Sequence, residues 1–233
     1  RGWRRKRRAA EIKLMFIDVR KAHLNAVCDE EAWVELPEEF WQWGRYAKLR
    51  RWLYGMRKAA AGWEEEYANK FENEGYKRGI GAPTVFHNKE AETRLVVHGD
   101  DFTFSGPRKE LERIRRKMKE WYEIKDRGIM GSGSDESKEV TILGRLLRWT
   151  EDGLEYEADP KHVQDLMEEE GLGDESNTMV SPAVKPKAGT EDQEEEELTR
   201  EEAKAFRGGA AKLNYLGHDR PDLQYATKEI CQG

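Results

Sequence analysis

Residues 95–104 read LVVHGDDFTF, two apolar runs separated by Gly99, Asp100 and Asp101. Each run suits a short strand, and Gly99-Asp100 suits a two-residue type II′ turn because glycine tolerates the positive φ that this turn requires. Adjacent carboxylates at the tip of a hairpin repel each other and disfavour folding unless a cation neutralises them. The stretch therefore predicts a hairpin whose acids need a counter-charge, although Gly-Asp-Asp also reads as a plain polar turn.

The elements around this hairpin predict an α+β fold. They are a buried strand at 13–19 ending near Asp18, a helix over 55–75, strands at 84–88 and 93–106, a helix over 107–122, and a strand at 139–149. The first helix would bury Met56, Ala60, Trp63, Tyr67 and Phe71. The second would have Ser105 or Gly106 as its cap, Pro107 in its first turn, and Leu111, Ile114, Met118 and Trp121 as its buried stripe.

This order matches the split βαββαβ arrangement, a ferredoxin-like sheet covered by two helices. The first and third strands are central neighbours in that topology, so we expect Asp18, Asp100 and Asp101 to converge. Hard divalent cations such as magnesium prefer carboxylate oxygens. Two such ions about 3.5–4 Å apart can hold the attacking and leaving oxygens of a phosphoryl transfer.

Charge is distributed unevenly along the chain. Residues 1–130 hold 29 Lys and Arg against 22 Asp and Glu, whereas residues 131–233 hold 12 against 25. A basic first part suits a polyanion such as nucleic acid, although a solvated charged surface also explains the count and is slightly favoured by charge alone. No apolar run approaches the roughly 20 residues of a membrane span, and no signal peptide is evident, so we expect an intracellular protein without a membrane partner. The sequence does not separate cytoplasm from nucleus.

The remaining segments are less regular. Residues 131–139 read as a flexible polar spacer, residues 160–171 as a helix, and residues 173–198, with part of the acidic run 191–202, as a flexible linker. Thr199 and Glu202 predict a capping box for a further helix, and a last helix is expected to start near Pro221.

Five motifs resemble copia-type retrotransposon reverse transcriptases, in that family's order. They are FIDVRKAHLNAVCDEEAWVELPEEF (16–40), KLRRWLYGMRKAAAGW (48–63), LVVHGDDFTFSG (95–106), ILGRLLRWTEDGLEYEADPKHV (142–163) and LNYLGHDRPDLQYA (213–226). The family's corresponding patterns are roughly DVknAFLnG, LYGLKQaprAW, YVDD, FLGi and tRPDi. The match spans nearly the whole chain.

The resemblance implies a polymerase palm whose metal-binding and catalytic acids are Asp18, Asp100 and Asp101. The Val19 carbonyl would help to hold the metal of the nucleotide. The cofactor would be two Mg²⁺ ions, with Mn²⁺ as an alternative. His98 and Gly99 replace the family's Tyr-Val, so the hairpin tip is expected to be more flexible and less apolar.

The resemblance also implies roles beside the acids. His23, where the family has Phe, would exclude a ribose 2′-hydroxyl, and the alternative interpretation is a histidine satisfied in the core. Arg57 and Lys58 replace Lys-Gln and would contact the nucleotide, with an exposed helix lysine as the alternative for Lys58. Lys125 is a candidate general acid or an ordinary surface residue. Leu143, Gly144 and Arg145 would belong to the primer grip.

We therefore expect a fragment of a retrotransposon Pol polyprotein that acts as an RNA-directed DNA polymerase. Its parts would be a basic segment (1–10), a palm with partial fingers (11–172), a linker (173–198) and the helical start of a thumb (199–233). Its partners would be a deoxynucleoside triphosphate, an RNA template with a DNA primer, and the integrase and ribonuclease H of the same polyprotein. The rivals are an inactive remnant that at most binds nucleic acid, and a nuclease that uses the same acids.

Overall fold

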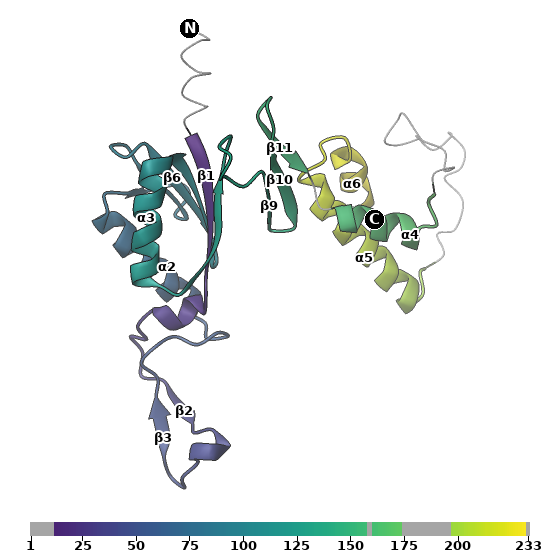
Figure 1. Cartoon of the computed structure of the whole chain (residues 1–233). Helices are drawn as coiled ribbons and strands as arrows, with labels where there is room; N and C mark the ends of the chain where they lie inside the picture. Colours follow the sequence, from purple (N-terminus) through teal and green to yellow (C-terminus); the bar gives the residue numbers. More distant parts are fainter. Residues whose placement is uncertain (1–11, 158–159, 174–196, 232–233) are drawn as a thin grey trace, which may run out of the picture. The chain divides into compact units, whose positions relative to one another are not determined.

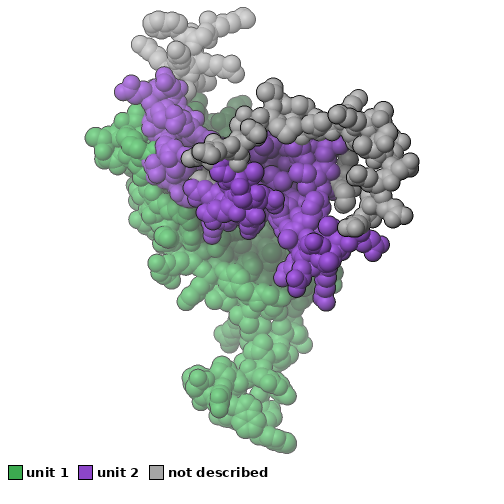
Figure 2. Space-filling model, turned by 90° about the vertical axis from the view of Figure 1, so that its right-hand side faces the viewer, with its two compact units in different colours: residues 1–138 green, residues 139–233 purple. Residues whose placement is uncertain are grey.

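A computed structural model describes residues 12–157, 160–173 and 197–231. The chain divides into two compact units, residues 1–138 and residues 139–233, which are coloured separately in Figure 2. The expected basic segment 1–10 and nearly all of the expected linker 173–198 lie outside the described residues. The expected palm domain, 11–172, spans both units, because residues 139–172 group with the C-terminal helices.

The first unit is built on a six-stranded sheet with the order β4-β5-β6-β7-β1-β8. Two of its strands, β1 and β6, are labelled in Figure 1. Its elements are β1 (Ile12–Val19), the 3₁₀ helix η1 (Ala22–Asn25), β2 (Trp33–Glu35), the 3₁₀ helix η2 (Glu38–Phe40), β3 (Tyr46–Lys48), α2 (Ala59–Asn73), β4 (Lys77–Arg78), β5 (Val85–Asn88), β6 (Thr93–His98), β7 (Asp101–Pro107), α3 (Arg108–Trp121) and β8 (Ile124–Met130).

Four of these strands and two helices follow one another as β1, α2, β6, β7, α3, β8. In the sheet β1 lies between β7 and β8 and pairs antiparallel with both. The last strand is β8, and the expectation that residues 139–149 supply it is wrong. Buried and exposed side chains do not alternate clearly along β8, whose sequence is IKDRGIM, because its pairing with β1 contains an irregularity in register.

The two faces of the sheet differ. Side chains alternate between buried and more exposed along β6 and β7, as expected for a sheet covered on one side. The buried set packs with the inner faces of α2 and α3 into one core, which includes Trp63, Phe71, Phe102, Leu111 and Ile114. The opposite face of β6 and β7 holds His98, Asp101 and Thr103 among its residues.

The two core helices begin later than expected. Helix α2 starts at Ala59 and buries Ala59 rather than Ala60, while Met56 lies before the helix. Strand β7 continues through Ser105 and Gly106 to Pro107, so neither Ser105 nor Gly106 caps α3. The stripe Leu111, Ile114 and Met118 is buried as predicted, and Trp121 is partly buried against the core.

Residues 131–138 are anchored, which corrects the expectation of a flexible spacer. The Glu136 side chain is 2% exposed and lies 2.9 Å from Lys13 Nζ in an ion pair. Its Oε2 also accepts a hydrogen bond from the Gly133 amide, and its Oε1 lies 3.3 Å from Arg108. A carboxylate buried this deeply requires such partners.

The hairpin of β2 and β3 carries large aromatic side chains in solvent. Trp33, Phe40, Trp41, Trp43 and Tyr46 are all exposed, and Lys48 Nζ lies 5.7 Å from the centre of the Trp33 ring. An exposed aromatic group of this size is unusual unless something binds to it.

The second unit contains β9 (Glu139–Ile142), β10 (Arg145–Trp149), β11 (Leu154–Glu157), α4 (Pro160–Glu169), α5 (Arg200–Gly217) and α6 (Gln224–Ile230). The predicted strand 139–149 is in fact two strands, β9 and β10, because Leu143 and Gly144 both adopt positive φ and turn the chain. The capping box of Thr199 and Glu202 at the start of α5 is confirmed. The last helix begins at Gln224, three residues after Pro221.

Candidate functional site

The candidate site lies where β1 meets the hairpin of β6 and β7. Gly99 has a φ of +63° and Asp100 does not have positive φ, which agrees with the predicted type II′ turn. The Val19 amide donates a hydrogen bond of 2.9 Å to the Asp100 carbonyl, so the end of β1 is attached to the turn.

Four side chains form a row across the sheet at this level. His98 on β6 pairs with Asp101 on β7, Asp101 pairs with Asp18 on β1, and Asp18 pairs with Lys125 on β8. Directly opposed residues of antiparallel strands have side chains on the same face. Two acids therefore lie side by side on the sheet, flanked by a histidine and a lysine.

Arg127 lies at this acidic pair. Its Nη2 is 3.2 Å from Asp18 Oδ2 and 3.3 Å from Asp101 Oδ1. Burial raises the pKa of Asp101 above its ordinary value, and the charges of Asp100 and Asp18 raise it further, whereas Arg127 and His98 oppose this rise. The counter-charge that the sequence requires is thus supplied within the described residues by an arginine.

Asp100 occupies a different position from the other two acids. It lies in the turn, is exposed, and is not part of the cross-strand pair. Within the described ranges no group of three or more His, Cys, Asp or Glu side chains is arranged to hold a metal ion. The structure therefore brings Asp18 and Asp101 together and leaves the expected three-acid convergence incomplete.

The donor chemistry nevertheless suits magnesium. Asp18 and Asp101 keep side-chain exposures of 28% and 23%, so both carboxylates remain accessible. Magnesium is usually held by one or two protein carboxylates, and substrate phosphates and water complete its shell. Two adjacent carboxylates on an accessible face fit that pattern, with Arg127 as the cation they now contact.

Trp63 supports the site from the helical side of the sheet. Its Nε1 donates a hydrogen bond of 2.9 Å to the Gly99 carbonyl at the hairpin tip. The indole is 2% exposed and makes an edge contact with Tyr122, with 5.0 Å between ring centres. A core side chain therefore contacts the hairpin tip, while the expectation of a more flexible turn stays a prediction.

The residues expected to contact the nucleotide are His23, Arg57 and Lys58. His23 lies in η1 and stacks on Tyr54, with ring centres 4.3 Å apart, and its buried Nδ1 has no hydrogen-bond partner among the described residues. Lys58 pairs with Glu30, and that hydrogen bond raises the pKa of the lysine. Arg57 is exposed. No described hydrogen bond or ion pair joins these three residues to Asp18 or Asp101.

The candidate primer-grip residues belong to the second unit. Leu143 and Gly144 form the turn between β9 and β10, and Arg145 lies 2.8 Å from Asp219. The Tyr215 hydroxyl donates to the Leu143 carbonyl. Arg145 is thus engaged in fastening the hairpin to α5 and the turn that follows it.

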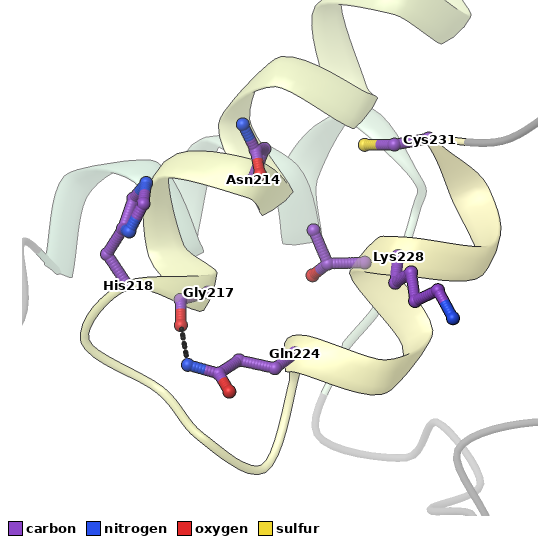
Figure 3. A pocket seen from close by; sticks show the side chains of 7 residues that line it. Asn214, Gly217, His218, Gln224, Lys228 and Cys231 are labelled. Atoms are coloured by element: carbon purple, nitrogen blue, oxygen red, sulfur yellow. Dashed lines mark hydrogen bonds between the residues drawn. The ribbon is translucent and has the colours of Figure 1, made fainter.

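A pocket lies at the corner between α5 and α6 (Figure 3). Gln224 Nε2 donates a hydrogen bond of 3.0 Å to the Gly217 carbonyl across this corner, and Thr227 is buried beside it. The pocket is lined by Asn214, Gly217, His218, Gln224, Thr227, Lys228 and Cys231. The motif LNYLGHDRPDLQYA (213–226) therefore contains the contact that joins α5 to α6.

Arg127 is the site residue that the sequence interpretation missed. Gly128 directly after it was the available signal, because glycine inside a strand often marks a bulge. The acids opposite Arg127 come from strands far away in sequence, so the ion pairs themselves have no local signature.

Comparison with known proteins gives one distant relationship. Over 125 residues the chain is 24% identical to the Retrovirus-related Pol polyprotein from transposon TNT 1-94 of Nicotiana tabacum. The aligned stretch covers 51% of this chain and only 9% of that polyprotein. No family model matches the chain. In the part of the chain that the structure describes, no helix is long and apolar enough to cross a membrane. Half of this chain is thus distantly similar to a small part of a transposon Pol polyprotein.

Proposed function

We propose that the first unit is the palm of an RNA-directed DNA polymerase from a retrotransposon Pol polyprotein. The observation that carries this proposal is the cross-strand pair of Asp18 and Asp101 beside the Gly99-Asp100 turn. The strand order around β1 and the distant similarity to a transposon Pol polyprotein are consistent with it.

The proposed reaction joins a primer 3′-hydroxyl to the α-phosphate of a deoxynucleoside triphosphate and releases pyrophosphate. Two divalent ions, when bound, would supply positive charge at the attacking and leaving oxygens. Asp18 and Asp101 would hold them, with Asp100 in the adjoining turn and the Val19 carbonyl as further oxygen donors. Lys125, opposite Asp18 on β8, would give a proton to the leaving pyrophosphate.

The proposed partner is an RNA template paired with a DNA primer. The exposed aromatic side chains of the β2–β3 segment support this choice, since bases of single-stranded nucleic acid stack on aromatic rings. Lys48 beside Trp33 adds a positive charge there. An interaction with the integrase and ribonuclease H of the same polyprotein belongs to the same proposal.

A primer-extension experiment separates the candidate activities. The full chain is incubated with an RNA template, a labelled DNA primer and Mg²⁺, with and without deoxynucleoside triphosphates. A polymerase extends the primer only when nucleotides are present. Degradation of the template without nucleotides would instead indicate a nuclease. A folded protein that neither extends nor degrades would contradict the polymerase proposal and indicate an inactive remnant.

A further inference from the structure

Arg127 contacts both acids of the proposed site through a single nitrogen atom. Its Nη2 lies 3.2 Å from Asp18 and 3.3 Å from Asp101, and the arginine side chain is 28% exposed. A guanidinium is charged at every pH at which the protein is folded. The acidic pair therefore has a permanent internal counter-ion.

A bulge in β8 gives Arg127 this position. Ile17 pairs with Asp126 and Met15 pairs with Ile129, so two residues of β8, Arg127 and Gly128, are opposite a single residue of β1. Gly128 has a φ of +89°, and its amide donates a 2.9 Å hydrogen bond to Asp126 Oδ1. Bulges of this kind redirect a side chain and are frequent beside active sites.

The bulge also keeps the neighbours of Arg127 on the helical side of the sheet. Asp126 forms an ion pair with Arg115 of α3, and Ile129 belongs to the hydrophobic core. In a regular strand, residues 126 and 129 would face opposite sides. Arg127 is thus directed to the acids, and Gly128 absorbs the change in register.

A divalent cation and Arg127 compete for the same carboxylate oxygens. We propose that Arg127 occupies the acidic pair when no metal is bound and must leave it before a divalent cation can bind, so that it lowers the affinity of the site for metal. This inference rests on the proposed function, because it takes Asp18 and Asp101 as the metal ligands. Arg127 would then set the divalent-cation concentration that the reaction requires.

The test measures binding of Mn²⁺ alone to the full chain, by the loss of the electron paramagnetic resonance signal of free Mn²⁺. Arg127→Gln is expected to lower the dissociation constant at least about tenfold, because it removes both a competitor and a positive charge at contact distance. Arg127→Lys keeps the charge without the planar guanidinium, and its affinity should lie between those of Arg127→Gln and the wild type.

Arg148→Gln is the matched control. Arg148 also pairs with two acids of neighbouring strands, Glu139 and Glu157, but it lies in the second unit. This variant has the same change of charge and should bind Mn²⁺ as the wild type does.

Thermal denaturation gives a second readout. Mn²⁺ should raise the melting temperature of Arg127→Gln more than that of the wild type, because the bound metal replaces the missing counter-ion.

The outcomes separate this inference from the proposed function. Tighter binding in Arg127→Gln that is lost in the double variant with Asp101→Asn supports both. Equal or weaker Mn²⁺ binding in Arg127→Gln overturns the proposed competition. The proposed metal site is still supported in that case if Asp101→Asn abolishes the Mn²⁺ binding that the wild type shows. If neither the wild type nor Arg127→Gln binds Mn²⁺ through these acids, both proposals fail. Should Arg127→Gln not fold, Arg127→Lys decides the question by the same comparison with the wild type.

Discussion

Replacing Trp63 by phenylalanine removes the one side-chain hydrogen bond that the structure shows between α2 and the tip of the candidate hairpin. The lost bond from Nε1 to the Gly99 carbonyl costs about 0.5–1.5 kcal/mol. The smaller ring leaves a gap in a site that is only 2% exposed, which adds about 1–2 kcal/mol. We expect the free energy of unfolding to fall by about 1.5–3.5 kcal/mol in total.

Tyr122→Phe provides the matched comparison. Tyr122 packs edge-on against Trp63, but its buried hydroxyl has no hydrogen-bond partner among the described residues. Removing that hydroxyl relieves an unsatisfied group, so the variant should be neutral or more stable by up to about 1 kcal/mol. Both variants retain an aromatic ring in the same core. They differ in whether the polar group that is removed had a hydrogen-bond partner in the structure.

Urea denaturation of the two variants measures this difference, and amide hydrogen exchange at Val19 locates it. The Val19 amide donates to the Asp100 carbonyl in the same turn. Its exchange should accelerate in Trp63→Phe and remain unchanged in Tyr122→Phe. If Trp63→Phe is no less stable than Tyr122→Phe, the indole does not support the hairpin as described.

Three further changes have defined outcomes. Burial raises the pKa of Asp101, so the contribution of this side chain to stability falls as the pH rises from the ordinary pKa of 3.8 through the folded-state pKa. In urea denaturation, Asp101→Asn should therefore be more stable than the wild type at pH 7 and should lose that advantage below about pH 3.8. Lower stability of Asp101→Asn at pH 7 would contradict this prediction. Lys13→Met leaves the buried Glu136 with only its remaining partners and should lower the free energy of unfolding by about 2–3 kcal/mol, whereas an unchanged urea midpoint would show that the pair is not buried in solution. Thr199→Ala removes the capping box with Glu202 and should cost α5 about 1 kcal/mol, measured as faster amide exchange in its first turn; unchanged exchange there would argue against the cap.

Local sequence pattern predicted the parts of the fold that depend on neighbouring residues. The hairpin at 95–104 follows from alternation and from one glycine with positive φ, and the stripe on α3 follows from helical spacing. The capping box at Thr199 is likewise a relationship between residues three positions apart. Each of these features is determined within one element or one turn.

The features that sequence missed depend on distant contacts or on irregular backbone. Strand β8 has no clear alternation because the bulge at Arg127 and Gly128 shifts its register. Residues 131–138 look flexible in sequence, but Glu136 pairs with Lys13 at the other end of the unit's sequence. The turn at Leu143 lies inside an apolar run that otherwise reads as one strand. The pairing of Asp101 rather than Asp100 with Asp18 also required the register of the sheet.

The acidic pair on the accessible face of the sheet is proposed to perform nucleotidyl transfer. Single-turnover extension of a DNA primer on an RNA template with Mg²⁺, measured for Asp18→Asn, Asp101→Asn and Asp152→Asn, tests it most directly. Asp152 is an exposed residue in the β10–β11 connection and controls for loss of one carboxylate in a turn. We predict that the rate falls at least about 100-fold in each of the first two variants and is unchanged in the third. Extension by the wild type that persists at the same rate in Asp18→Asn or Asp101→Asn would contradict the claim.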